Sequence, residues 1–162
     1  MQPLVDLQLL VLLAVANGTP VFAKKLLGDR FAWALDGGAR FVDGQPLFGR
    51  SKTIRGIVLA VLVTTAIAPL IGLDGSIGLE VGALAMAGDL FSSFLKRRLR
   101  LAPSSMALGL DQVPESLFPL LACRAALSLS AADIVVCVAV FFLGELAISR
   151  LLYRLGIRDR PY

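Results

Sequence analysis

Long apolar runs alternate with basic segments along this chain of 162 residues. A helix needs roughly 20 apolar residues to cross a hydrocarbon core about 30 Å thick. Five runs approach that length, and they predict five transmembrane helices at residues 4–23, 57–73, 77–95, 113–129 and 134–152. We therefore expect an all-α, polytopic integral membrane protein that forms a single domain over residues 1–162.

The positions of the basic residues predict the orientation in the membrane. Fifteen of the sixteen Lys and Arg residues fall within residues 24–55, 96–100 and 150–160. Basic loops are retained on the cytoplasmic side of a membrane, so we expect the N-terminus outside and the C-terminus inside. The long segments 24–56 and 96–112 then become cytoplasmic loops. We expect a multi-pass protein of the cell inner (plasma) membrane whose active site faces the cytoplasm.

Composition excludes several kinds of chemistry. The mean hydropathy of +0.79 fits a membrane bundle, and the net charge of +4 comes from residues at membrane edges, so we expect no nucleic-acid partner. The chain has no His, which excludes imidazole bases and His-ligated metals. Any chemistry must therefore use carboxylates, Lys and Arg. No feature of the sequence specifies an oligomeric state.

Polar residues within the predicted spans lie at one depth. Asn17, Asp89 and Glu145 each fall roughly 9–10 Å inside the cytoplasmic end of their helices. Ionisable groups in a span need a partner, water or a function, so a polar cavity would explain all three. Pro20 would free a backbone carbonyl near Asn17, although a proline kink that serves packing alone is an alternative.

One face of the third predicted helix combines a deep carboxylate with shallow cations. Asp89, Ser93, Lys96, Arg97 and Arg100 follow helical spacing and form one stripe. This layout suits a metal-bound polyphosphate, because the carboxylate would hold the metal and the cations would face the phosphates. A positive-inside anchor would explain the cations but not Asp89.

A second pair of carboxylates stands at the start of the fourth predicted helix. Asp111 and Glu115 are one turn apart on one face, beside Pro114. They could cap the helix N-terminus. Alternatively, Asp89 and Asp111 could converge on one pocket and hold one or two Mg²⁺ ions, as attack at phosphorus with a pyrophosphate leaving group usually requires.

The sequence also contains a candidate phosphate-binding segment and a candidate structural ion pair. Residues 49–56, Gly-Arg-Ser-Lys-Thr-Ile-Arg-Gly, combine backbone donors, hydroxyls and cations in a phosphate-binding composition without the spacing of a Walker A loop. Glu80 and Arg124 lie near the opposite face, where we expect them to form a structural ion pair.

Taken in order, these motifs resemble the CDP-archaeol synthase family, small five-helix relatives of the bacterial CDP-diacylglycerol synthases. The resemblance covers nearly the whole chain up to Pro119. Its elements are residues 17–20 (Asn-Gly-Thr-Pro), 43–44 (Asp-Gly), 49–56, 88–98 and 110–112 (Leu-Asp-Gln).

The resemblance implies an enzyme, a CTP-dependent nucleotidyltransferase that transfers a cytidylyl group to a lipid phosphate in the bilayer and releases pyrophosphate. It implies Mg²⁺ on Asp89 and Asp111, and a catalytic set completed by Lys96. The family pattern and the polar positions also predict the residues that contact substrate. These are Asn17, Asp43, Lys52, Thr53, Arg55, Ser93, Arg97, Arg98 and Glu115. The lipid acceptor stays open, because Pro114 stands where the family pattern has a second Asp.

Two alternatives remain. A small transporter or membrane assembly factor would distribute polar groups to both faces of the bundle, whereas here they gather on the inner face. A CDP-alcohol phosphotransferase would need the pattern Asp-Gly-x-x-Ala-Arg, but residues 36–40 lack one position of it.

Overall fold

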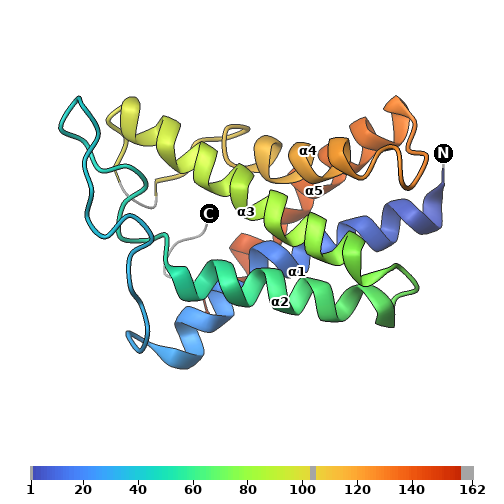
Figure 1. Cartoon of the computed structure of the whole chain (residues 1–162), viewed down its shortest axis with the longest axis horizontal. Helices are drawn as coiled ribbons and strands as arrows, with labels where there is room; N and C mark the ends of the chain where they lie inside the picture. Colours follow the sequence, from blue (N-terminus) through green and yellow to red (C-terminus); the bar gives the residue numbers. More distant parts are fainter. Residues whose placement is uncertain (1, 103–104, 158–162) are drawn as a thin grey trace.

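The computed structural model describes residues 2–102 and 105–157. The described part of the chain contains five helices and no strand beyond two isolated bridges, so the prediction of an all-α fold is confirmed. The helices are α1 (Pro3–Leu27), α2 (Ile54–Leu70), α3 (Gly75–Arg98), α4 (Gln112–Ala122) and α5 (Ala131–Arg154), as Figure 1 shows.

The two ends of the helix bundle differ in their connections. Short turns join α2 to α3 and α4 to α5 at the end where the N-terminus lies, and we call this the turn end (Figure 1). Residues 28–53, 99–102 and 105–111 lie at the opposite end, which we call the loop end. The loop end is therefore where most of the irregular chain gathers.

Three helices have the length and the hydropathy to cross a membrane. These are α1, α3 and α5, while α2 is apolar but only 17 residues long. The fourth helix extends less far than the sequence predicted, because it ends at Ala122 and not near residue 129. Eleven residues of helix span only about 16 Å. Ser128 has a positive φ of 51°, and the chain there turns back toward α5.

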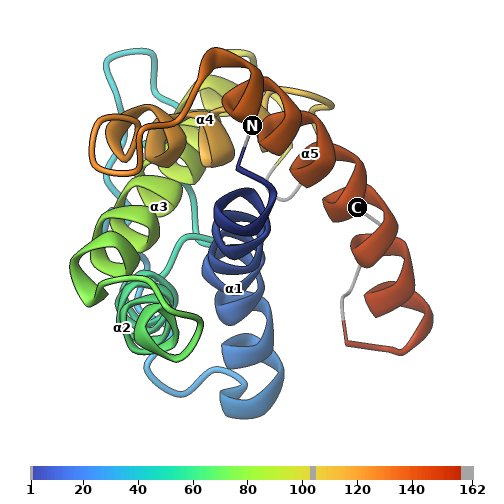
Figure 2. The ribbon, with the colours of Figure 1, turned by 90° about the vertical axis from the view of Figure 1, so that its right-hand side faces the viewer.

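The α1 helix contacts the other four helices, and α3 lies between α2 and α4. Leu9, Leu12 and Leu13 of α1 are fully buried in the core, together with Val81 of α3. Figure 2 shows α5 at the edge of the bundle, where it packs on α4 and α1. Gly78 permits the close approach of α3 to α2, because a Cβ atom there would lie 2.7 Å from the Thr64 carbonyl oxygen.

The expected ion pair between Glu80 and Arg124 is wrong. Both residues belong to the described chain, and no ion pair joins them. Glu80 Oε2 instead lies 3.6 Å from the Cys123 sulfur, and Arg124 is exposed in the turn that follows α4. The prediction failed because it treated residue 124 as part of a continuous helix.

Candidate active site at the loop end

A cavity of about 850 Å³ opens at the loop end, and all five helices contribute to its lining. Asn17, Asp89 and Glu145 all line it, so the polar hollow predicted from their common depth is present. Pro20 lines it too. The α1 helix continues through residues 17–20, and Asn17 Nδ2 donates to the Leu13 carbonyl at 3.1 Å.

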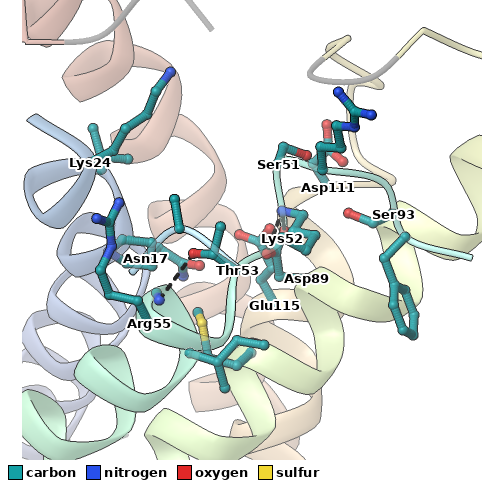
Figure 3. Close-up of a pocket in the computed structure, with 18 of the residues that line it drawn as sticks. Asn17, Lys24, Ser51, Lys52, Thr53, Arg55, Asp89, Ser93, Asp111 and Glu115 are labelled. Carbon is teal, nitrogen blue, oxygen red and sulfur yellow. Dashed lines mark hydrogen bonds and ion pairs between the residues drawn. The ribbon is translucent and has the colours of Figure 1, made fainter. Parts of the chain in front are cut away.

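The centre of the cavity is an ion pair between the loop before α2 and the middle of α3. Lys52 Nζ lies 2.6 Å from Asp89 Oδ1 and 2.5 Å from Asp89 Oδ2. Figure 3 shows the two side chains next to each other. Burial of the ammonium group opposes its charge, but Asp89 beside it, with Glu115 and Asp111 nearby, raises the pKa of Lys52 above its usual value. Lys52 is therefore a fixed positive charge at neutral pH.

Glu115 faces Asp89 from α4. Its side chain is buried, and its carboxyl group lies beside that of Asp89 (Figure 3). Gly88 makes this proximity possible, because a Cβ atom there would lie 2.3 Å from the Pro114 carbonyl oxygen and 2.7 Å from the Glu115 nitrogen. Two acidic groups this close need a shared proton or a cation between them.

Asp111 forms a second ion pair at the N-terminal end of α4. Lys96 Nζ lies 2.6 Å from Asp111 Oδ1 and also donates to the Ser105 carbonyl at 3.1 Å. Asp111 makes no side-chain capping bond to α4 and accepts instead from the Ala107 N–H at 3.0 Å. The capping alternative therefore does not describe Asp111, whose carboxylate turns toward the cavity and the segment before the helix.

Asp36 holds the loop that carries Lys52. Its carboxylate accepts from the backbone N–H groups of Gly38 at 3.0 Å, Phe48 at 3.0 Å and Gly49 at 2.9 Å. Partial burial works against the charge, but these three donors lower the pKa of Asp36 below its usual value. In the sequence, Asp36 belongs only to an incomplete Asp-Gly-x-x-Ala-Arg pattern, which does not indicate this role.

The residues that follow Lys52 have structural partners of their own. Thr53 is the N-cap of α2 and accepts from the Gly56 N–H at 3.2 Å. The Arg55 guanidinium donates to the backbone carbonyls of Gly28 and Arg30, and so closes the C-terminal end of α1. Thr53 and Arg55 both line the cavity, but part of their hydrogen-bonding capacity serves the fold.

Other residues of the polar stripe on α3 also face the cavity. Ser93, Lys96 and Arg97 line the cavity, and Arg97 Nη2 donates to the Ala102 carbonyl at 3.0 Å. Arg97 is only 4% exposed, and its Nε atom has no hydrogen-bond partner. This nitrogen is a donor that an anionic ligand in the cavity could satisfy.

Asp43 and Arg98 lie together, but outside the cavity lining. Arg98 Nη1 is 2.5 Å from Asp43 Oδ1, and its guanidinium stacks 4.7 Å from the Phe41 ring and 4.8 Å from the Phe94 ring. This cluster attaches the tip of the first loop to the end of α3. The structure brings the other ten predicted site residues to one cavity and places these two beside it.

Several polar residues that line the cavity lie outside the set of predicted site residues. Lys24 and Lys25 extend the polar face of α1 beyond Asn17, where the predicted helix had already ended. A helix continued to residue 27 would have placed Lys24 two turns from Asn17 on the same face. Arg50 and Ser51 of the segment 49–56 and Gln112 of the motif 110–112 also line the cavity, although the predicted site residues did not include them.

The oxygen donors of this cavity suit Mg²⁺. Asp89, Asp111 and Glu115 all line it, although no group of three or more Asp, Glu, Cys or His residues among the described positions is gathered closely enough to enclose an ion. Mg²⁺ commonly uses one or two protein carboxylates and completes its shell with water and substrate phosphates.

Comparison with known proteins supports the same interpretation. The family described as CarS-like, CDP-archaeol synthase, matches residues 74–162. The chain is 35% identical to the CDP-archaeol synthase of Thermofilum pendens over 156 residues, which cover 91% of this chain and 76% of that protein. It is 32% identical to the CDP-archaeol synthase of Sulfurisphaera tokodaii over 154 residues, which cover 91% of this chain and 89% of that protein.

A solved structure has the same fold. It is described as an intramembrane enzyme for archaeal membrane lipids biosynthesis, and it matches with a TM-score of 0.75 and 30% sequence identity over 87% of this chain and 90% of that one. The protein is thus a membrane protein, as its long apolar helices indicate. The chain belongs to the CarS-like CDP-archaeol synthase family, and the expected enzyme class, a CTP-dependent lipid cytidylyltransferase, is confirmed at that level.

Proposed function

We propose that this protein transfers the cytidylyl group of CTP to the phosphate of a membrane lipid and releases pyrophosphate. The observation that carries the proposal is the loop-end cavity, where Asp89, Glu115 and Asp111 meet Lys52 and Lys96. A cavity of about 850 Å³ that contains both signs of charge suits a nucleoside triphosphate with its cation.

The residues of the cavity divide by charge. Asp89 and Asp111 would hold Mg²⁺, with Glu115 beside them, and the bound ion would neutralise charge on the triphosphate. Lys52, Lys96 and Arg97 would bind phosphate oxygens, and the unpaired Nε of Arg97 is one of the donors available. Asn17, Ser93 and Thr53 offer neutral polar groups along the same walls.

The reaction needs no covalent enzyme intermediate. An oxygen of the lipid phosphate attacks the α-phosphorus of CTP, a new P–O–P link forms, and the bond to the β-phosphate breaks as pyrophosphate leaves. The lysines and Arg97 would orient both phosphates and stabilise the charge that develops on the leaving group. A chain without His can perform this chemistry by positioning and charge neutralisation alone.

Asp43, Arg98 and Arg55 would act through the loops. The cluster of Asp43 and Arg98 would keep the first loop folded over the nucleotide, and Arg55 would hold the end of α1 against the start of α2. These are positioning residues, because their charged groups contact protein atoms in the structure.

The proposed orientation places the loop end in the cytoplasm. The N-terminus would lie outside and all five helices would contribute to the membrane domain, with the short α4 held within the bundle by α3 and α5. The basic residues of α1 and α3 lie at the loop end, which fits retention on the cytoplasmic side of the plasma membrane. CTP and Mg²⁺ would then enter directly from the cytoplasm.

The test is a pyrophosphate-release assay on the purified protein with radiolabelled CTP, Mg²⁺ and a panel of lipid phosphates that have ether-linked isoprenoid or ester-linked acyl chains. We expect release of pyrophosphate only when a lipid phosphate is present, together with a labelled lipid product. If no member of the panel supports release above the lipid-free background, the proposed transfer is wrong and a non-enzymatic membrane role takes its place.

A further inference from the structure

Each aspartate of the proposed metal site is already bridged by a lysine. Lys52 Nζ contacts both carboxylate oxygens of Asp89, and Lys96 Nζ lies 2.6 Å from Asp111 Oδ1. The two lysines come from different segments, the loop before α2 and the end of α3. The same arrangement of an aspartate with a lysine thus occurs twice in one cavity.

These contacts place a monovalent cation where a divalent one would bind. Because Lys52 reaches both oxygens of Asp89, a metal ion that approached this carboxylate would meet the ammonium group at very short range. Like charges a few ångströms apart in a partly buried site repel strongly. Asp89 and Lys52 are each about one-fifth exposed, so solvent screens this repulsion only in part.

A triphosphate in the cavity would offer the two lysines other acceptors for their ammonium groups. Both line the cavity that would hold the phosphates. A lysine carries a compact charge on a flexible stem, and its three donors can move between acceptors a few ångströms apart. Phosphate oxygens would therefore take over the ammonium groups and leave the carboxylate oxygens free.

We propose that Lys52 and Lys96 are exchangeable counter-ions that keep the free enzyme from binding a divalent cation and release the carboxylates only when a nucleotide triphosphate arrives. The metal ion then enters together with the nucleotide and not before it. This inference rests on the proposed function, and it adds an order of binding controlled by the chain's own lysines.

The test measures Mn²⁺ binding by electron paramagnetic resonance on the purified protein at pH 8, with and without CTP and without any lipid. We expect the wild-type protein to bind Mn²⁺ weakly alone and tightly with CTP. Removal of one charge in Lys52→Met should tighten the binding of Mn²⁺ alone by about tenfold or more, since one unit of repulsion is lost. Lys52→Arg keeps the charge, so its binding of Mn²⁺ alone should stay as weak as in the wild type.

Lys96→Met provides an independent second variant. It should also tighten the binding of Mn²⁺ alone, by a smaller factor, because Lys96 contacts one oxygen of Asp111 whereas Lys52 contacts two of Asp89. A thermal melt in detergent accompanies each variant, so that only folded protein is compared. If one lysine variant does not fold, the other decides the outcome.

The possible outcomes separate the two proposals. Wild-type protein that binds Mn²⁺ alone as tightly as the folded lysine variants would overturn the counter-ion inference and leave the proposed function intact. Mn²⁺ that fails to bind even with CTP in every protein would instead overturn the metal site on which both proposals rest.

Discussion

The two ends of the bundle use carboxylates in different ways. At the turn end, Asp74 accepts from the Ser76 N–H at 2.7 Å, and Asp133 accepts from the Ser130 N–H at 2.9 Å and from the Gln2 N–H at 3.2 Å. These acceptors complete helix starts, which leave backbone N–H groups without partners inside the helix. The start of its own helix accounts for Asp74, while Asp133 caps α5 and also accepts from the backbone just before α1.

Two carboxylates in the loop-end cavity pair instead with charged side chains from other segments. Asp89 meets Lys52, which is 37 positions away in the sequence, and Asp111 meets Lys96. Asp89 also faces Glu115 across the contact between α3 and α4. A carboxylate that serves the backbone is a structural residue, whereas one that tertiary packing brings next to other charges is a candidate for chemistry.

The largest expected effect is the loss of activity in Asp89→Asn. The amide would remove the charge that holds Lys52 and the proposed cation, so lipid-dependent pyrophosphate release should fall by about a thousandfold. The matched control is Asp133→Asn at the turn end, which should retain wild-type activity per folded molecule. Similar losses in both variants would erase the distinction between the two ends.

Gly88→Ala should separate Asp89 from Glu115 without changing any charge. The added methyl group would overlap the backbone of α4 at Pro114, so the two helices must move apart. We expect about 1–3 kcal/mol of destabilisation and a fall in activity of about a hundredfold. Gly144→Ala is the control, because no atom lies within 4 Å of its added methyl group. Full activity in Gly88→Ala would show that this close contact is unnecessary.

Asp36→Asn should loosen the loop that presents Lys52. The amide group would place donors opposite the N–H groups of Phe48 and Gly49, so we expect KM for CTP to rise by about tenfold while the helical content measured by circular dichroism stays the same. An unchanged KM would mean that the loop is ordered without this carboxylate.

The pH dependence of this loop follows from the same hydrogen bonds. Because the pKa of Asp36 is lowered in the folded protein, its contribution is complete above the usual value of about 4 and is lost only as the pH falls through the lowered pKa. Titration between pH 5 and pH 8 should therefore leave KM unaffected by Asp36. A change in KM within that range that disappears in Asp36→Asn would contradict this assignment.

The smallest effect belongs to the turn end. Asp74→Ala removes the N-cap acceptor of α3, so the melting temperature in detergent should fall by a few degrees. Activity per folded molecule should not change, because the residue lies at the far end of α3 from the cavity. Loss of activity beyond the loss of folded protein would place Asp74 in the site.

The sequence predicted the helices and the common depth of the polar groups better than it predicted the loops. Long hydrophobic runs mark segments that can lie in a bilayer, so five helices and the convergence of Asn17, Asp89 and Glu145 followed from counting along each span. Arg98 continues the basic run of α3, yet the structure turns it onto Phe41 and Phe94. These contacts depend on the conformation of the loop that carries Phe41, which the hydrophobic pattern of the sequence does not predict.

The contacts of Asp36 and Glu80 were also not predicted from the sequence. The three N–H partners of Asp36 are set by tight turns in residues 28–53, so its role becomes visible only in three dimensions. Glu80 was assigned a partner on the assumption that α4 runs a full span, and the early end of that helix at Ala122 removed the partner. Both cases depended on the irregular chain between helices.

The most direct test of the central claim is calorimetric titration of CTP into the purified protein with and without Mg²⁺, on wild type, Asp89→Asn and Asp133→Asn. The account predicts that Mg²⁺ strengthens CTP binding in wild type and Asp133→Asn, and that this strengthening is absent in Asp89→Asn. An Asp89→Asn protein that binds CTP with the full Mg²⁺ effect would contradict it.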